Sequence, residues 1–305
     1  MPASWPALPY EAWSATCDTL HAHTQLLGKL AVALAPPEPQ LQHAALRLTA
    51  RGWETLPLPA PDGSGAVVVV LDLRRHEAVV EHSGGNLRSI ALSPKRPVGD
   101  VTRDVLKAVE ALAGPVQIDP RPQEVPWTVH LDEDHDHTTY DPEQVATYFR
   151  AATQAALVLA TLRAPYRGRS SPVNAWWGTF DLAVSLFSGQ PADPPSNEFI
   201  MRNSANAQQI EIGWWPGDAR YPHAAFYAFA VPAQEGLEAA TLSPPGRWDP
   251  GLKEYILDWE DIRTSSHPRQ RAVEFGRSVI DHACTVCDWE PALAASAQGV
   301  PPPVV

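Results

Sequence analysis

The densest group of acid–base and metal-ligating side chains is the segment HLDEDHDHTTYDPE at residues 130–143. Its imidazoles and carboxylates are types that ligate divalent metals, and its acids partly match the spacing of a calcium loop. However, His137 stands where that loop requires glycine. The segment ends in Asp141-Pro142, which is typical of the start of a helix. We therefore favour an acidic capping loop. The alternative is a metal site formed by Asp132, Asp134, His135, Asp136 and His137.

A second polar group follows one side of a helix expected at residues 10–34. His21, Gln25 and Lys29 recur every four residues and lie opposite a stripe of leucines. An exposed polar face is the ordinary explanation of such a stripe. The alternative is a ligand pocket in which His21 acts as an acid, base or donor and Lys29 binds an anionic group.

Paired tryptophans occur on two expected strands, as Trp176-Trp177 and Trp214-Trp215. Because neighbouring residues of a strand face opposite sides, one of each pair can pack in a core while the other faces a second surface. Core packing is the default explanation. An aromatic wall of a ligand pocket is the alternative.

Hydrophobic periodicity predicts helices with antiparallel strands between them. The expected helices cover residues 10–34, 98–112, 142–162 and 269–289. The expected strands cover residues 46–53, 66–73, 77–82, 87–92, 173–177, 180–187, 209–214, 225–231 and 255–259, and residues 189–206 read as a long polar loop. Strand–helix–strand alternation is absent, so we predict an α+β fold, with a mainly antiparallel sheet packed by three to four helices.

The order helix, strands, helix occurs twice along the chain. We expect one integrated domain over residues 1–298, with two similar halves at 1–114 and 140–298. A proline-rich acidic crossover at 115–139 would join them, and a tail at 299–305 is expected to be disordered.

Composition limits the classes of partner. The chain has 305 residues and a formal charge of −12, which disfavours binding to nucleic acid. There is neither a signal-peptide pattern nor an apolar run long enough for a membrane span, so we expect no membrane partner. Only three cysteines occur, which favours a cytoplasmic location. No phosphate-loop, dinucleotide or zinc-protease motif is present, so no cofactor is predicted, and the oligomeric state is left open.

Several strings together resemble a bacterial protein family known as domain of unknown function 5996. They are WPALPYEAW at 5–13, TLHAHTQLLGKL at 19–30, LTARG at 48–52, HTTYDPEQV at 137–145, GRSSPVNAWWGTFDLAVSLFSG at 168–189, WWPGDARYPHAAFYAFAVP at 214–232 and DWEDIR at 258–263. The resemblance implies no activity, cofactor or partner. From the resemblance we expect a histidine where Asn174 stands and a His-Glu pair near Ala207-Gln208, and this chain has neither. If those residues do chemistry in the family, this member lacks it.

These observations predict a cytoplasmic small-molecule-binding protein, with or without catalytic activity. The candidate pocket residues are His21, Thr24, Gln25, Lys29, His137, Tyr140, Asn174, Trp177, Asp181 and Trp214. One competing hypothesis is a metal-dependent hydrolase that uses residues 130–137. Another is a protein-interaction scaffold whose proline-rich loops make the contacts.

Overall fold

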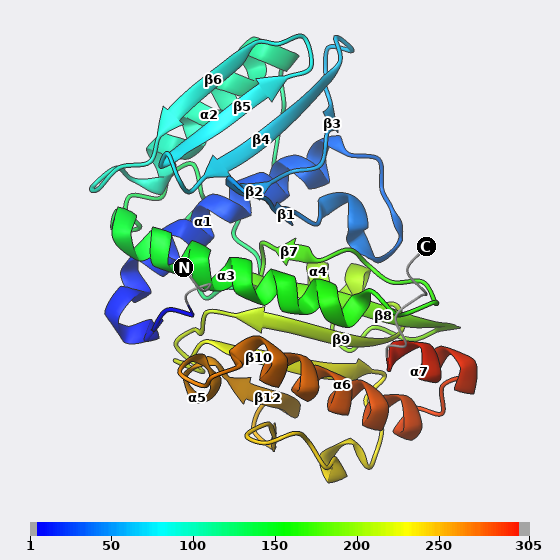
Figure 1. Cartoon of the computed structure of the whole chain (residues 1–305). Coiled ribbons are helices and arrows are strands. Elements are labelled where there is room, and N and C mark those ends of the chain that lie inside the picture. Colours follow the sequence, from blue (N-terminus) through cyan, green and yellow to red (C-terminus); the bar gives the residue numbers. More distant parts are fainter. Residues whose placement is uncertain (1–4, 299–305) are drawn as a thin grey trace, which may run out of the picture. The chain divides into compact units, whose positions relative to one another are not determined.

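The computed structural model describes residues 5–298. This part of the chain divides into two compact units that interleave along the sequence. We call residues 11–149 and 175–180 the N-terminal unit, and residues 5–10, 150–174 and 181–298 the C-terminal unit. Helices accompany two antiparallel sheets, so the α+β prediction is confirmed (Figure 1). The predicted disordered tail lies outside the described residues.

The N-terminal unit contains α1 (Tyr10–Leu34), whose bounds match the predicted helix. Its sheet has the strand order β1-β2-β4-β5-β6, with β3 paired to β4, and α2 (Val98–Ala113) packs on β4, β5 and β6 (Figure 1). The strands are β1 (Arg47–Leu48), β2 (Gly52–Glu54), β3 (Leu58–Pro59), β4 (Ala66–Asp72), β5 (Glu77–His82) and β6 (Leu87–Ala91). A short 3-10 helix, Pro39–Ala44, precedes them, and the expected crossover at 115–139 contains neither helix nor strand.

One strand prediction was wrong in this unit. Residues 46–53 form the tight hairpin of β1 and β2 rather than one strand, and Leu48 pairs with Trp53. The backbone N–H of Thr49 donates to the carbonyl oxygen of Gly52 over 2.7 Å. Gly52 adopts a φ of 151°, a conformation that glycine reaches without a side-chain clash.

The C-terminal unit holds the second antiparallel sheet, with the order β11-β12-β10-β9-β8. Its strands are β8 (Asp181–Pro191), β9 (Ala207–Trp215), β10 (Ala225–Val231), β11 (Arg247–Asp249) and β12 (Glu254–Asp258). Its helices are α4 (Phe199–Ser204), α5 (Trp259–Arg263), α6 (Pro268–Val286) and α7 (Pro291–Ala297), with a 3-10 turn at Leu237–Ala239. β7 (Asn174–Trp176) begins in this unit and ends in the other. The long loop predicted at 189–206 was partly wrong, because β8 runs on to Pro191 and α4 lies within it.

The two faces of the C-terminal sheet differ in chemistry. α6 packs against β9, β10 and β12 (Figure 1). The ring of Tyr255 on β12 contacts that of His282 on α6. The residues that share the face of Tyr255 are apolar and buried: Leu182, Val184, Leu186, Ile210, Ile212, Trp214, Phe226, Ala228 and Leu257. Residues at the alternate positions face the other side, and many of these are polar.

Helix α3 (Pro142–Arg163) begins with the predicted cap. The carboxylate of Asp141 accepts hydrogen bonds from the backbone N–H groups of Glu143 over 2.8 Å and Gln144 over 3.2 Å. The side chain of Gln144 does not return to the backbone N–H of Asp141, as it would in a capping box, because it donates to the carbonyl oxygen of Ala12 over 3.0 Å.

α3 is also the one described helix that is long and apolar enough to cross a membrane by length and composition. Its unit boundary falls between Phe149 and Arg150. The core helix of a globular protein passes the same test, and Ala151, Ala155 and Leu159 of α3 are fully buried. The finding is therefore weak evidence for a membrane span.

The contact between Gly28 and Trp177 holds α1 in the N-terminal unit. Trp177 is fully buried, and its indole N–H donates to the carbonyl oxygen of Ala44 over 3.1 Å. A Cβ atom at Gly28 would lie 2.1 Å from the indole ring, far inside van der Waals contact. The absence of a side chain at Gly28 therefore creates the space that the indole fills.

We predict that Gly28→Ala destabilises the protein. In an unobstructed helix this change is worth about 1 kcal/mol of stabilisation, but here overpacking should cost roughly 1–3 kcal/mol. Urea unfolding measures the difference. The same substitution should cost less in a Trp177→Phe background, because the smaller ring leaves room for the methyl group. Purely additive effects in the double mutant would contradict this explanation.

Candidate functional site

Gln25 pairs through both ends of its side-chain amide. Its side chain is fully buried in the N-terminal unit. Its amide nitrogen donates to the carbonyl oxygen of Gln123 over 2.9 Å, and its amide oxygen accepts from the N–H of Gln123 over 3.0 Å. These two hydrogen bonds resemble those between paired β-strands, and they connect the irregular segment 115–139 to α1. The residue therefore has a structural role that the helical spacing did not predict.

His21 also binds the backbone. Its Nε2–H donates to the carbonyl oxygens of Trp177 over 2.9 Å and Gly178 over 3.1 Å. Its ring stacks on Phe180, with centroids 5.0 Å apart, and meets the edge of Trp127 at 5.1 Å. These contacts position the chain at residues 175–180 against α1.

Lys29 is buried although it carries a charge. Its ammonium nitrogen lies 5.6 Å from the ring centroid of Trp177 and 3.9 Å from the carboxylate of Asp119. Burial lowers the pKa of Lys29 to about 8, with a further lowering by Arg121 and an opposing effect of Asp119. The aromatic face and one exposed carboxylate thus stabilise the ammonium group.

His137 and Asp134 form a short ion pair in the same unit. The Nδ1–H of His137 donates to Asp134 over 2.7 Å, and the ring of Trp127 lies 4.4 Å from that of His137. Burial lowers the pKa of His137, but the hydrogen bond and charge of Asp134, aided by Asp18 and Asp136, outweigh burial and raise the pKa above its usual value. The predicted pocket residues His21 and His137 therefore both contact the indole ring of Trp127.

Thr24 and Tyr140 have local partners. The hydroxyl of Thr24 donates to the carbonyl oxygen of His21 over 2.7 Å, within α1. The hydroxyl of Tyr140 lies 3.1 Å from Nδ1 of His76, and burial raises its pKa. Both are buried and contribute to packing.

The proposed metal ligands do not converge. Within residues 5–298, no three histidine, cysteine or acidic side chains are arranged to hold a metal ion. Asp134 instead accepts from the backbone N–H groups of Asp136 and His137, each over 3.0 Å, while His135 and Asp136 are exposed. This part of the segment is the loop that the capping interpretation describes.

The C-terminal unit brings a different polar group together around Asp181. Tyr227 on β10 lies opposite Gly213 on β9, and Gly213 lies opposite Ala183 on β8. A Cβ at Gly213 would be 2.3 Å from the ring of Tyr227, so this ring lies directly over the glycine. The Tyr227 hydroxyl consequently crosses β9, donates to Asp181 on β8 and lies 3.5 Å from Glu211.

Glu211 is the centre of this group. It accepts a hydrogen bond from the hydroxyl of Ser185 over 2.9 Å and a longer one from the amide of Gln209 over 3.4 Å. Burial and the neighbouring charge of Asp181 raise the pKa of Glu211 to about 8, although the hydrogen bonds from Ser185 and Tyr227 oppose this. Glu211 is therefore largely protonated at neutral pH.

Glu254 on β12 extends the group. It precedes Tyr255, the partner of Ala228, so it lies beside Phe229 on the same face as Glu211. Burial, followed by the charge of Asp181, raises the pKa of Glu254 to about 7. We call this surface the acidic face, comprising Asp181, Ser185, Gln209, Glu211, Tyr227 and Glu254.

Sequence reasoning found one residue of the acidic face, Asp181, and missed the rest. Trp214 lies on the buried side of the sheet, and the partly exposed Trp215 shares the face of Asp181. Asn174 is buried in β7. The alternation in QQIEIGWW could have located these residues, because Gln209 and Glu211 alternate with buried isoleucines.

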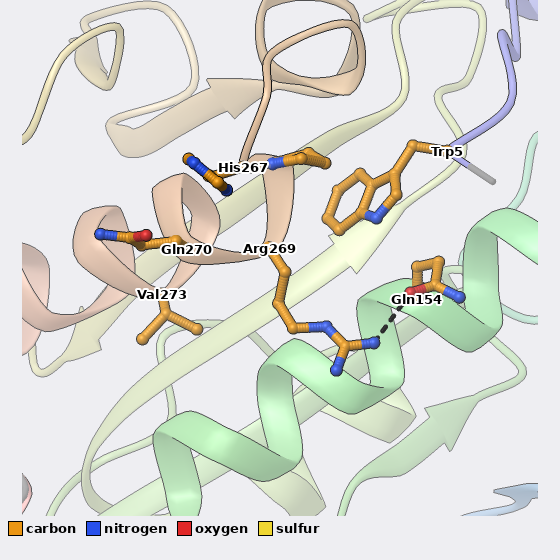
Figure 2. A pocket seen from close by; sticks show the side chains of 7 residues that line it. Trp5, Gln154, His267, Arg269, Gln270 and Val273 are labelled. Carbon is orange, nitrogen blue, oxygen red and sulfur yellow. Dashed lines mark hydrogen bonds between the residues drawn. The ribbon is translucent and has the colours of Figure 1, made fainter. Parts of the chain in front are cut away.

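A separate groove of about 440 Å³ lies in the C-terminal unit, between the start of α6 and α3 (Figure 2). Trp5 and Val273 form apolar parts of its wall, and Arg269 donates to Gln154 over 3.0 Å across it. None of the predicted pocket residues lines it. Its lining lacks a carboxylate, so the groove and the acidic face are chemically unlike.

We predict that Gln25→Leu destabilises the N-terminal unit by about 2–4 kcal/mol. The change leaves the N–H and C=O of the half-buried Gln123 without their partner, and an unsatisfied group costs up to about 1–3 kcal/mol. Chemical unfolding measures the loss. Gln234→Leu, at an exposed site, is the matched control and should have little effect. A loss no larger than that of the control would show that the Gln123 contact is dispensable.

A second prediction concerns pH. Because the pKa of His137 is raised in the folded state, its ion pair stabilises the protein fully below the unfolded pKa of about 6.5 and is lost as pH rises through the folded value. His137→Gln should therefore cost more stability at about pH 6 than at about pH 8.5.

The imidazole titration followed by NMR provides a direct check, and Asp134→Asn should lower its midpoint. His23, whose pKa burial lowers to about 4, stays neutral over this range and does not confuse the comparison. An unchanged midpoint in the Asp134 variant would contradict the prediction.

Comparison with known proteins agrees with the resemblance in the sequence. No curated protein and no solved structure shows significant similarity to the chain. One family model matches residues 5–296, which is nearly the whole described chain. The chain therefore belongs to DUF5996, a family of unknown function.

Proposed function

We propose that this chain is a small-molecule-binding protein and that its ligand binds on the acidic face of the C-terminal unit. The observation that carries the proposal is the reach of Tyr227 across Gly213 to Asp181 and Glu211. Such an arrangement needs a glycine, a tyrosine and two carboxylates on three different strands. Packing alone requires none of these polar groups.

The energetics of the acidic face support a role beyond folding. The pKa rises to about 8 at Glu211 and to about 7 at Glu254. Carboxyl groups with raised pKa values destabilise the folded state when they are ionised. Proteins keep such groups chiefly where a ligand or a reaction uses them. Glu211 and Glu254 are also partly exposed, so a bound molecule can reach them.

Aromatic surface next to the carboxyl groups supplies the apolar contact that a small ligand needs. The ring of Trp215 meets that of Tyr227 at 5.2 Å, and Tyr227 stacks with Phe229 at 6.1 Å. Trp215 and Phe229 are partly exposed. An apolar wall beside a few polar groups is the usual composition of a ligand site.

The polar residues of the N-terminal unit give less support to a ligand site. Gln25 and His21 are bonded to backbone groups, and Asp134 caps a loop. These contacts explain their burial without a ligand. A metal-dependent hydrolase at residues 130–137 likewise has no set of converging ligands within the described chain.

We predict that small molecules which bind the folded chain shift the backbone amide signals of β8, β9 and β10 in a fragment screen followed by NMR. Gly213→Ala should abolish these shifts, because the added methyl group displaces the ring of Tyr227. Tyr227→Phe keeps the ring and removes only the hydroxyl, so it should weaken binding about tenfold even if the alanine variant folds poorly.

Gly251→Ala is the matched control, since Gly251 is exposed and a Cβ there meets only the carboxylate of Asp249, at 3.2 Å. It should leave the shifts unchanged. Ligand-induced shifts confined to α1 and to residues 119–137 would contradict the proposal and would favour a site around Trp127 instead.

A further inference from the structure

The acidic face contains one fully buried side-chain oxygen that has no hydrogen-bond partner among the described residues. The side chain of Gln209 is 1% exposed, and its Oε1 atom forms no hydrogen bond within the described chain. Its Nε2 atom points at Glu211, 3.4 Å away. An unpaired buried acceptor costs about 1–3 kcal/mol, so the fold gains nothing from leaving it in this state.

The missing partner of Gln209 must be a hydrogen-bond donor. The terminal torsion of a glutamine side chain is soft, and half a turn exchanges its nitrogen and oxygen. After that turn Oε1 faces the carboxyl group of Glu211. A donor held there could bind both the amide oxygen of Gln209 and a carboxylate oxygen of Glu211.

Most of the charge around this position is negative. One cation, Arg169, lies on the same side of β8, with its guanidinium carbon 3.8 Å from the ring centroid of Phe187, the β8 partner of Gln209. Asp181 on β8, Glu211 on β9 and Glu254 on β12 interact electrostatically, and Tyr227 on β10 adds only a neutral hydroxyl. Within residues 5–298, no lysine or arginine forms an ion pair with Glu211 or Glu254. The positive charge of Arg220 lowers the pKa of Glu254, and the negative charge of Asp249 raises it. Arg247 is already paired with Asp258 over 2.8 Å.

We infer that the ligand of the acidic face is a small organic ammonium ion, a protonated amine that donates to Glu211 and Gln209 and packs its apolar part on Trp215 and Phe229. The inference rests on the proposed function and specifies the class of ligand. An anionic ligand would be repelled by the carboxylates. A metal ion would need three converging ligands, which the described residues do not supply. A neutral donor would satisfy Gln209 but would add no positive charge beside Glu211 and Glu254.

The state of Glu211 predicts how binding depends on pH. Its pKa is raised by burial and by Asp181, so it is mainly protonated near neutral pH in the free protein. The ammonium ion attracts only the carboxylate form, so binding releases a proton. Affinity should consequently rise from about pH 6 to about pH 8, as Glu211 and Glu254 ionise.

Three related probes separate charge from hydrogen bonding in titration calorimetry with the full chain. Benzylammonium carries both a charge and N–H donors. Benzyltrimethylammonium keeps the charge and has no donor, and benzyl alcohol has a donor and no charge. We expect benzylammonium to bind with release of a proton, seen as a dependence of the heat on the buffer. The other two probes should bind at least about tenfold more weakly.

Variants locate the interaction. Glu211→Gln should weaken the binding of benzylammonium at least about tenfold, and it should fold, because it removes an acid whose ionisation the fold opposes. Gln209→Met removes one of the two acceptors and should narrow the difference in affinity between benzylammonium and benzyltrimethylammonium. Glu235→Gln changes an exposed acid elsewhere in the same unit, so it controls for net charge and should have no effect.

The outcomes distinguish the ligand class from the site. Equal binding of benzyl alcohol and benzylammonium, with amide shifts on β8, β9 and β10, would refute the ammonium ligand and leave the site intact. The same holds if Glu211→Gln leaves benzylammonium binding unchanged. Shifts elsewhere, or no binding by any probe at millimolar concentration together with no fragment hit on this face, would overturn both the ligand class and the proposed function.

Discussion

The acidic face depends on one steric constraint, the contact between the ring of Tyr227 and the bare backbone of Gly213. In a pleated sheet, side chains on adjacent strands stand side by side and rarely cross the strand between them. A glycine on the middle strand removes this obstacle and lets the hydroxyl of β10 reach a carboxylate of β8. Ala183 and Ala225 occupy neighbouring positions of the sheet, and their side chains are short. This crossing gives Asp181 and Glu211 a shared hydroxyl partner, while burial and the charge of Asp181 raise the pKa of Glu211.

The two faces of that sheet have different roles: one packs in the core, and the other is the proposed binding surface. The side against α6 is apolar and buried, and it supplies the packing that stabilises the C-terminal unit. The opposite side concentrates carboxyl groups that oppose one another and an amide oxygen without a partner. A ligand that brings positive charge and a donor would relieve both costs. Electrostatic cost in the free protein would thus be recovered as binding energy.

The N-terminal unit uses polar side chains for the opposite purpose. Segment 115–139 has no helix or strand, so its backbone groups need other partners. Gln25 supplies two of them from α1, and His21 does the same for the carbonyl oxygens at Trp177 and Gly178. Gly28 completes the arrangement by admitting the indole of Trp177. A polar stripe on a helix therefore serves here as a set of backbone hydrogen-bond partners.

The sequence by itself determined the parts that depend on neighbours along the chain. Periodicity located α1 and α2, the cap at Asp141 located the start of α3, and the absence of parallel alternation identified the α+β class. It placed His21, Gln25 and Lys29 on one stripe but could not say what they would meet. Strand register decided the rest. It put Trp214 in the core and Trp215 beside Asp181. It also placed Glu211 between Ser185, 26 positions earlier, and Phe229, 18 positions later. Alternation along one strand gives the two faces, but only pairing between strands decides which side chains share a face and what charge they create there.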